Sequence, residues 1–323
     1  MRFFATPGEL RQRGVLGMNQ RNAGYIMRYN PRRLYPLVDN KLETKRLALQ
    51  DGIAVPELYG VVAIEHQVHE LASILADHQS LVIKPAHGSG GSGILVINGR
   101  MGKYFRKANG SLLSIESIQH HTSNILSGMY SLGGIPDKAI LEYRVDFDPM
   151  FEHISYQGVP DFRIIVFKGI PTAAMIRLPT RDSDGKANLH QGAVGLGVNI
   201  ATGATSQAVH HNQLVEHHPD TGYETTGIAI PHWDNILRLA MKCADTVGLG
   251  YLGVDIVIDR NLGPLMLELN ARPGLSIQLA IGHGLLKSLY KIEACKQLPT
   301  DLEARLALAK DLHQCEDIKE VIN

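Results

Sequence analysis

The sequence predicts an α+β fold whose sheets are mainly antiparallel. Apolar runs on both sides of short turns indicate two β-hairpins, residues 161–179 turning at Lys168-Gly169 and residues 251–270 turning at the segment RNLG. Helical patterns at residues 39–52, 65–78 and 234–248 are interspersed with these strands. Hairpins and helices mixed along one chain are typical of this class.

Other segments complete the expected order of elements. Asn40 and Glu43 have capping-box spacing at the start of the first helix, and Gly52 marks its end. Extended segments are expected at residues 53–62, 80–85, 93–99 and 138–147, and mostly loop at 180–226. We expect four parts: an extended arm with one short helix (1–38), a first subdomain (39–141), a second subdomain (142–299) and a helical tail (300–323).

Composition excludes several classes of function. The 323 residues contain 32 Lys+Arg and 32 Asp+Glu, which argues against a nucleic-acid binder because such proteins carry a basic excess. No stretch approaches the roughly 18 apolar residues of a membrane span, and the N-terminus lacks a signal-peptide core. Cys243, Cys295 and Cys315 show no CxxC spacing, so we expect reduced thiols in a cytoplasmic protein.

The second hairpin places two carboxylates opposite each other. If Asp259 faces Pro264 across a four-residue turn, Asp255 faces Glu268. Side chains at such positions lie about 5 Å apart, and two like charges at that distance repel by roughly 3 kcal/mol at an effective dielectric constant near 20. In this register the apolar face would consist of Leu265, Leu267 and Leu269.

A divalent cation between the two carboxylates would remove this repulsion. Asn270 follows Glu268 by two residues and adds an oxygen ligand on the same face. Oxygen ligands without Cys or His suit Mg²⁺ or Mn²⁺. The alternative is a pair of solvated acids on an open sheet face. The histidine pairs at 120–121, 210–211 and 217–218 are expected to be solvated loop residues rather than metal ligands.

A glycine-rich loop lies between two expected strands, in the segment VIKPAHGSGGSGILVI. Glycines let backbone N–H groups wrap phosphate oxygens. Lys84 precedes the loop and a strand follows it, so this is not a Walker A loop. The order predicts a hairpin flap closing over a nucleotide, with Lys84 reaching the phosphates. The alternative is an ordinary surface hairpin. The loop residues are Gly88, Ser89, Gly90, Gly91 and Gly93.

These motifs occur in an order that resembles the ATP-grasp superfamily. The succession is DNKLETKRLA, VIKPAHGSGGSGI, ILEYRV, DFRIIVF, ANLHQGA, GVDIVID and LELNARPG, from about Asp39 to about Leu286. More narrowly, the chain resembles the RimK-type α-L-glutamate ligases, and most of all the α-L-glutamate-ligase-like proteins associated with sugar transfer. This resemblance implies two α+β subdomains that grip ATP and two Mg²⁺ or Mn²⁺ ions between them.

The resemblance also implies a reaction and a set of site residues. A carboxylate takes the γ-phosphate to give an acylphosphate, ADP leaves, and an amine attacks to form an amide. The substrates would be an amino acid such as glutamate and a peptide or cell-envelope acceptor. By motif matching, the nucleotide and its phosphates would be contacted by Lys41, Lys84, Glu142, Tyr143, Asp161, Arg163 and Lys186. Catalytic positions would be Lys84, Arg177, Asn188 and, for the substrate carboxylate, Arg272. The metal ligands would be Asp255, Glu268 and Asn270.

Only 40 residues precede Lys41, and in this part the sequence departs from the ligases. ATP-grasp ligases usually carry a complete α/β domain there. We expect the arm to fold across the body and bring its arginines (Arg11, Arg13 and Arg21, or Arg32 and Arg33) to the acceptor entrance. Alternatively, a second subunit or a partner protein completes the site. Two other functions stay open, a non-catalytic regulator that binds nucleotide and peptide, and a phosphotransferase.

Overall fold

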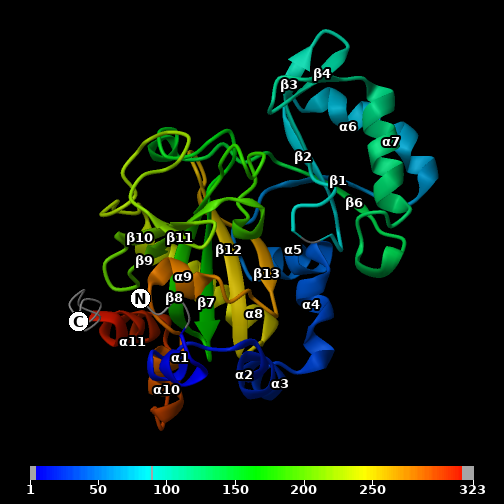
Figure 1. Cartoon of the computed structure of the whole chain (residues 1–323). Coiled ribbons are helices and arrows are strands. Elements are labelled where there is room, and N and C mark those ends of the chain that lie inside the picture. The colour runs from blue at the N-terminus through cyan, green and yellow to red at the C-terminus, as the bar shows by residue number, and fades with distance from the viewer. Residues whose placement is uncertain (1–4, 89, 315–323) are drawn as a thin grey trace.

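The computed structural model describes residues 5–88 and 90–314, which form two antiparallel sheets with helices (Figure 1). The smaller sheet has six strands in the order β1-β6-β2-β3-β4-β5, and all of its paired strands run antiparallel. Its strands are β1 (Leu58–Val62), β2 (Leu81–Pro85), β3 (Leu95–Met101), β4 (Tyr104–Lys107), β5 (Leu112–Leu113) and β6 (Ala139–Glu142). Two helical segments pack with this sheet, η3–α6 (Glu65–Glu70 and Leu71–Asp77) and α7 (Ile115–Leu126).

The larger sheet has seven strands in the order β11-β10-β9-β8-β7-β12-β13, again antiparallel. The bounds are β7 (Asp161–Phe167), β8 (Ile170–Leu178), β9 (Val194–Val198), β10 (Thr205–His210), β11 (Gln213–Val215), β12 (Tyr251–Asp259) and β13 (Gly263–Asn270). Lys168 and Gly169 both have positive φ, so the β7–β8 hairpin turns where the sequence predicts. The α+β class and the mainly antiparallel sheets are confirmed.

Helices cover the larger sheet and close its core. Its longest helix, α8 (Trp233–Val247), buries Ile236, Leu237 and Ala240 against this sheet. The α8 helix ends at Gly248, which adopts the left-handed conformation that favours glycine. The other helices of this body are α9 (Ile277–Ile281), α10 (Leu286–Ala294) and α11 (Leu302–Gln314). The predicted helix after Thr300 is therefore present up to residue 314.

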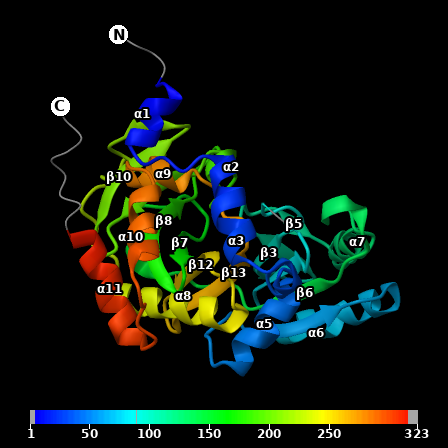
Figure 2. The same ribbon diagram turned by 90° about the horizontal axis from the view of Figure 1, so that it is seen from below.

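The N-terminal segment is mostly helical, so the expectation of an extended arm is wrong. It contains α1 (Pro7–Gln12), α2 (Met18–Gln20), a π-helical turn η1 (Arg21–Ile26), α3 (Met27–Tyr29), η2 (Arg32–Leu34) and α4 (Pro36–Asp39). Figure 2 shows these helices running across the larger body toward α5 (Lys41–Gln50). Leu16, Tyr25 and Ile26 are buried in the main core. The segment folds because it buries apolar side chains of its own, although their spacing is irregular.

Polar contacts also attach this segment to the larger body. The Asn30 side chain donates to the carbonyl oxygens of Tyr251 and Ala271 and accepts from the N–H of Tyr251. The Leu16 N–H donates to Oε1 of Gln278 at 2.8 Å. Because these groups are buried, loss of one of these hydrogen bonds would leave a buried polar group unpaired and destabilise the fold.

Residues 180–226 are mostly loop, as expected, but they also contain the three strands β9, β10 and β11, which the sequence analysis did not predict. The sequence of β9 is VGLGV, and its glycines hide the strand signal. Glycine is required at these two positions because neighbouring atoms leave no room for a side chain. A Cβ on Gly197 would lie 2.4 Å from the carbonyl oxygen of Ala280, and one on Gly195 would lie 2.8 Å from Leu189.

The β12–β13 hairpin pairs Asp255 with Glu268 as predicted, but by a different route. The turn has three residues, because Asp259 pairs with Gly263 and its carboxylate accepts two N–H groups within the turn. A bulge between Asp255 and Ile256 then restores the predicted register. As a result Met266 joins the main core, and Leu267 packs instead against a small cluster with Leu265.

The helix α5 begins and ends as predicted, with the Asn40 side chain accepting the N–H groups of Leu42 and Glu43. It packs on α8 and β13, and Ala48 is buried in the main core. Residues 41–50, which we expect in the first subdomain, thus pack with the larger sheet. The subdomain boundaries themselves stay a prediction. Among the described residues, no helix is both long and apolar enough to cross a membrane.

Candidate active site

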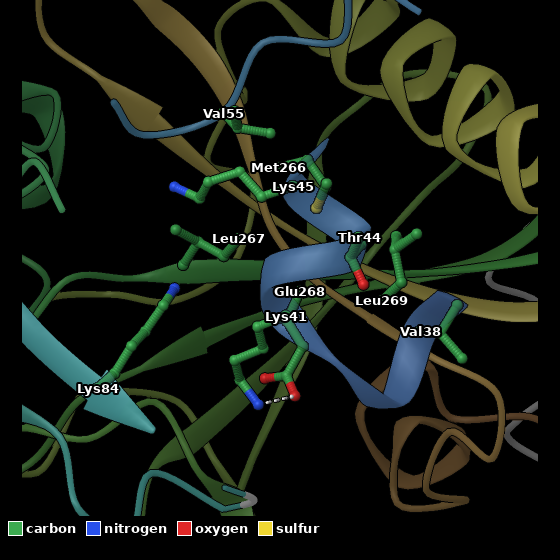
Figure 3. Close-up of a pocket in the computed structure, with 10 residues that line it drawn as sticks. All are labelled: Val38, Lys41, Thr44, Lys45, Val55, Lys84, Met266, Leu267, Glu268 and Leu269. Carbon is green, nitrogen blue, oxygen red and sulfur yellow. Dashed lines mark ion pairs between the residues drawn. The ribbon is translucent and has the colours of Figure 1, made fainter. Parts of the chain in front are cut away.

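Three lysines meet at the seam between the two sheets (Figure 3). Lys41 extends from α5 and its ammonium lies 3.1 Å from a carboxylate oxygen of Glu268 on β13. Lys84 extends from β2 into the same small pocket. The structure thus brings together two predicted phosphate contacts and one predicted metal ligand, from segments more than 180 residues apart. Lys45 also lines this pocket.

Lys45 is a site residue that the sequence reasoning missed. Its ammonium lies 2.6 Å from Glu142, donates to the carbonyl oxygen of Pro56, and is buried. Lys84 pairs with the same carboxylate. The signal was available, because Lys41 and Lys45 are four residues apart and so share a helix face.

One carboxylate therefore serves two buried ammonium groups. Burial by itself raises the pKa of Glu142, but Lys84 and Lys45 outweigh burial and lower it, so the carboxylate stays ionised. Burial lowers the pKa of Lys45, and the charge of Lys84 adds to this effect against the attraction of Glu142. The cluster holds surplus positive charge, which an anionic ligand would stabilise.

Four charged side chains form a second cluster on the larger sheet. Arg163 on β7 holds Asp255 with two hydrogen bonds of 2.5 Å, and Arg177 on β8 holds Asp161 at 2.5 and 2.6 Å. Arg177 also reaches Asp255 at 3.0 Å. The strand register explains this arrangement, because Asp255 lies opposite Arg163 and Asp161 lies opposite Arg177. We call these residues the sheet quartet.

The sheet quartet separates the pKa values of its two acids. Burial alone would raise the pKa of Asp255, but Arg163 and Arg177 together outweigh burial and hold it at about 2. Burial raises the pKa of Asp161 to about 6; Arg177 opposes this, and the negative charge of Asp255 adds to it. The repulsion expected between Asp255 and Glu268 is therefore relieved by Arg163, Arg177 and Lys41, without a cation.

The predicted metal ligands have the donor chemistry of a Mg²⁺ site. The Glu268 side chain is 37% exposed beside the Asp255 carboxylate of the neighbouring strand. Each carboxylate oxygen has two acceptor positions, so Asp255 can accept from a guanidinium and still face a cation. The carboxamide oxygen of Asn270 accepts the N–H of Arg272 at 3.0 Å and keeps a second acceptor position.

The glycine loop contacts the loop that carries Lys186 and Asn188. The Gln191 side chain donates to the carbonyl oxygen of Gly90, and a Cβ on Gly91 would lie 3.7 Å from Lys186. Gly90, Gly91 and Gly93 all have positive φ. Ser89, one of the predicted loop contacts, lies outside the described residues.

A cavity of about 410 Å³ adjoins the lysine pocket and shares Val38, Lys41, Glu268 and Leu269 with it. Arg272 lines it and lies over the ring of Tyr35 from the N-terminal segment, 4.9 Å from the ring centroid. The arginines expected at an entrance do not line this cavity. Arg21 instead donates to the carbonyl oxygen of Pro273, while Arg11, Arg13, Arg32 and Arg33 are exposed elsewhere. The cavity is lined by Val38, Asp39, Lys41, His87, Gly88, Ser131, Ile135, Pro136, Glu268, Leu269, Asn270, Ala271 and Arg272.

Two other predicted nucleotide contacts lie between the sheets. Glu142 ends β6, and the Tyr143 hydroxyl donates to Asp259 at 2.9 Å. Burial, followed by this bond, raises the pKa of Tyr143 to about 12. The next residue, Arg144, has a buried Nε atom without a hydrogen-bond partner in the described structure. The Nε–H group of Arg144 could therefore donate a hydrogen bond to a ligand bound here.

The histidine pairs are not all solvated loop residues. His121 lies on α7 and bonds to the carbonyl oxygen of Gly93, and His218 is buried. His210 and His211 form a group with Asp182 whose ligand atoms all lie within 4.8 Å of one another. This group has the composition of a cation site, contrary to expectation. Its His211–Asp182 contact of 3.2 Å links the loop of residues 179–193 to the β10–β11 turn. Cys243 and Cys295 are free thiols, and Cys315 lies outside the described residues.

Two antiparallel sheets that enclose a seam, with a glycine hairpin in one and an acidic hairpin in the other, define an ATP-grasp fold. The chain belongs to the sugar-transfer associated ATP-grasp family, which it matches over residues 20–294.

The chain is also similar to three known proteins. A probable alpha-L-glutamate ligase of Maridesulfovibrio salexigens is 26% identical over 238 residues, which is 73% of this chain and 56% of that protein. The biotin carboxylase of Campylobacter jejuni in complex with β-γ-ATP has the same fold, with a TM-score of 0.52 at 15% identity over 84% of this chain and 49% of that one. The ATP-grasp ligase PsnB with precursor peptide PsnA2 and AMPPNP gives a TM-score of 0.47 at 14% identity over 86% of this chain and 62% of that one. The chain thus spans less than two thirds of the length of each.

Proposed function

We propose that the protein is an ATP-dependent, ADP-forming ligase that joins a carboxylate to an amine through an acylphosphate. The observation that carries this proposal is the convergence of Lys41 and Lys84 on the acidic hairpin at Glu268. Phosphoryl transfer requires positioning and charge neutralisation more than covalent chemistry by the protein. A seam with surplus positive charge beside oxygen ligands supplies both.

Each part of the site has a role in this proposal. Lys84 leaves its pairing with Glu142 to contact the phosphates, and Lys45 keeps that carboxylate paired. Glu268 and Asn270 hold Mg²⁺ (or Mn²⁺), with Asp255 beside them, and the ion when bound neutralises β- and γ-phosphate oxygens. Arg177 stabilises charge at the reacting phosphate, oriented by Asp161 and Asp255.

The substrates are proposed to be an amino acid such as glutamate and a peptide or envelope-type acceptor. The cavity beside the lysine pocket supports an extended acceptor, since it measures about 410 Å³ and contains Arg272. A guanidinium holds a substrate carboxylate with two hydrogen bonds. The relative from Maridesulfovibrio salexigens, which is described as a probable alpha-L-glutamate ligase, supports glutamate as the first substrate to test.

An ADP-release assay over amino acids and short peptides, with mass spectrometry of the products, tests the proposal. We expect ADP release that depends on Mg²⁺, on a carboxylate and on an amine, with an amide as product, and none from Glu268→Gln. Phosphate transfer to a hydroxyl would indicate a phosphotransferase. Nucleotide binding without turnover on any substrate pair would indicate a regulator, and either result would overturn the ligase proposal.

Truncation is not a suitable test of the N-terminal segment. Truncation at Tyr35 removes the buried side chains of Leu16, Tyr25 and Ile26. Such a protein loses part of its core, so failure to ligate would say nothing about substrate binding. A substitution at Tyr35, which contacts Arg272, is the appropriate test.

A further inference from the structure

His87, directly before the glycine loop, is paired with a carboxylate that is shielded from solvent. Its Nδ1 atom lies 2.7 Å from Oδ1 of Asp137, and its backbone N–H donates to Oδ2 at 2.8 Å. The side chain of Asp137 is 0% exposed, whereas that of His87 is 45% exposed. The N–H of Lys138 also donates to Oδ1, at 2.8 Å. These contacts fix the position of the carboxylate before any ligand binds.

The carboxylate determines which nitrogen of the imidazole carries the proton. An ionised carboxylate only accepts hydrogen bonds, so Nδ1 is the donor to Asp137. In the neutral ring this leaves the lone pair on Nε2, free to take a proton. The second exposed pair, His211 with Asp182, lacks this feature because the Asp182 side chain is 63% exposed to water.

His87 lies beside the groups proposed to hold the reacting phosphate. The residues on either side of it both contact Lys41, since Ala86 accepts its backbone N–H and Gly88 accepts its ammonium. His87 also lines the cavity that contains Glu268 and Arg272. The charged groups around that cavity are Asp39, Lys41, Glu268 and Arg272, with Asp137 behind the ring.

We propose that His87 is the general base that deprotonates the attacking amine, with Asp137 as its positioning residue; this rests on the proposed ligase function. The ammonium of the amine substrate gives one proton to Nε2 of His87 and becomes a neutral amine. Its lone pair forms the C–N bond to the acyl carbon as the bond from that carbon to the phosphate oxygen breaks. The departing phosphate takes the second amine proton, and Nε2 later releases its own to water.

The test uses two nucleophiles that differ in their need for a base. The carboxylate is the dipeptide Glu-Glu, and the nucleophile is either L-glutamate, whose amine is protonated at neutral pH, or hydroxylamine, which is mostly neutral there. With glutamate, His87→Gln should lower amide formation on the order of 10²–10⁴-fold, the usual contribution of a general base. With hydroxylamine, hydroxamate formation should continue at the rate of the parent.

Asp137→Asn should give the same split, since it removes the anion that orients the ring and stabilises the imidazolium. His66→Gln, at an exposed histidine on η3, is the matched control and should leave both rates unchanged.

Equal loss of both products in His87→Gln would show that the residue contacts ATP or shapes the loop, and would overturn the inference. Unchanged amide formation in that variant would overturn it as well. A parent that makes neither product with any carboxylate of the ADP-release panel would overturn the proposed function itself, and is distinguished from the first two results because the parent alone decides it.

Discussion

The sheet quartet differs in its charge balance from the lysine cluster, which consists of Lys41, Lys45, Lys84, Glu142 and Glu268. In the sheet quartet two aspartates face two arginines, and two of the contacts are bidentate. At the seam, three ammonium groups pair with two carboxylates, those of Glu142 and Glu268. A guanidinium has a fixed planar geometry, whereas an ammonium on a flexible stem can change partners. The difference teaches that the sheet quartet is held in one arrangement before any ligand binds, whereas the lysines can exchange their partners for a ligand.

The largest expected effect comes from breaking the sheet quartet at Asp255. Asp255→Asn leaves Arg163 without a carboxylate in a buried site, and removing one partner of such a pair costs about 3–5 kcal/mol. The repulsion from Glu268 that the sequence analysis expects would, by itself, make this substitution stabilising. Urea unfolding of parent and variant measures the change. Asp182→Asn, at a side chain that is 63% exposed, is the control and should stay within about 0.5 kcal/mol of the parent.

Acid should weaken the sheet quartet at a definite pH. The folded pKa of Asp255, about 2, lies below its ordinary 3.8, so its stabilisation is complete above pH 4 and is lost as the pH falls toward 2. The stability difference between parent and Asp255→Asn should shrink by about 2 kcal/mol over that range. Asp161 acts in the opposite direction, because its pKa is raised to about 6 and protonation between pH 6 and 3.8 favours the folded state. A difference that is constant with pH would contradict the pairing.

A substitution in the lysine cluster should weaken the binding of ATP. Lys84→Ala removes a charge-assisted contact to phosphate worth about 2 kcal/mol, which corresponds to roughly 30-fold weaker ATP binding. Its stability should change less than that of Asp255→Asn, because Glu142 keeps Lys45 as a partner. Calorimetric titration with ATP and Mg²⁺ measures the affinity. Lys103→Ala, at the exposed β3–β4 turn, is the control, and equal affinity in both variants would argue against a phosphate contact at Lys84.

The smallest effect is expected at Tyr35. Tyr35→Leu removes a cation–π contact with Arg272 worth about 0.5–1 kcal/mol at an exposed site. The KM for the carboxylate substrate should rise by roughly 2- to 5-fold while kcat changes little. Tyr35→Phe keeps the ring face and should behave like the parent. A larger loss in Tyr35→Phe than in Tyr35→Leu would show that the hydroxyl matters instead.

Sequence reasoning predicted the fold class because its evidence was local. Capping at Asn40, the turn at Lys168-Gly169 and the helix ending at Gly248 depend on neighbouring residues alone. The Asp255–Glu268 pairing was predicted from the wrong turn length, and the bulge in β12–β13 compensated for the error.

What the sequence could not show depends on contacts between distant residues. The partners of Asp255 lie on β7 and β8, so their neutralising effect appears only when the sheet is assembled. The spacing to Lys41 places Lys45 on the same helix face, but its pairing with Glu142 exists only in the folded chain. Asp137 was not identified by the sequence analysis, because it contacts His87, which is 50 residues away in the sequence.

The buried N-terminal segment has a consequence for how the chain is made. Leu16 bonds to Gln278, 262 residues later, and Asn30 bonds to Tyr251, 221 residues later. At a synthesis rate of about 5–20 residues per second, the first helices leave the ribosome roughly 10–50 s before their partners exist. During that time Tyr25 and Ile26 have no core to enter. Folding of the larger body should therefore finish only near the end of translation, and chaperones that cover early apolar segments should increase the yield.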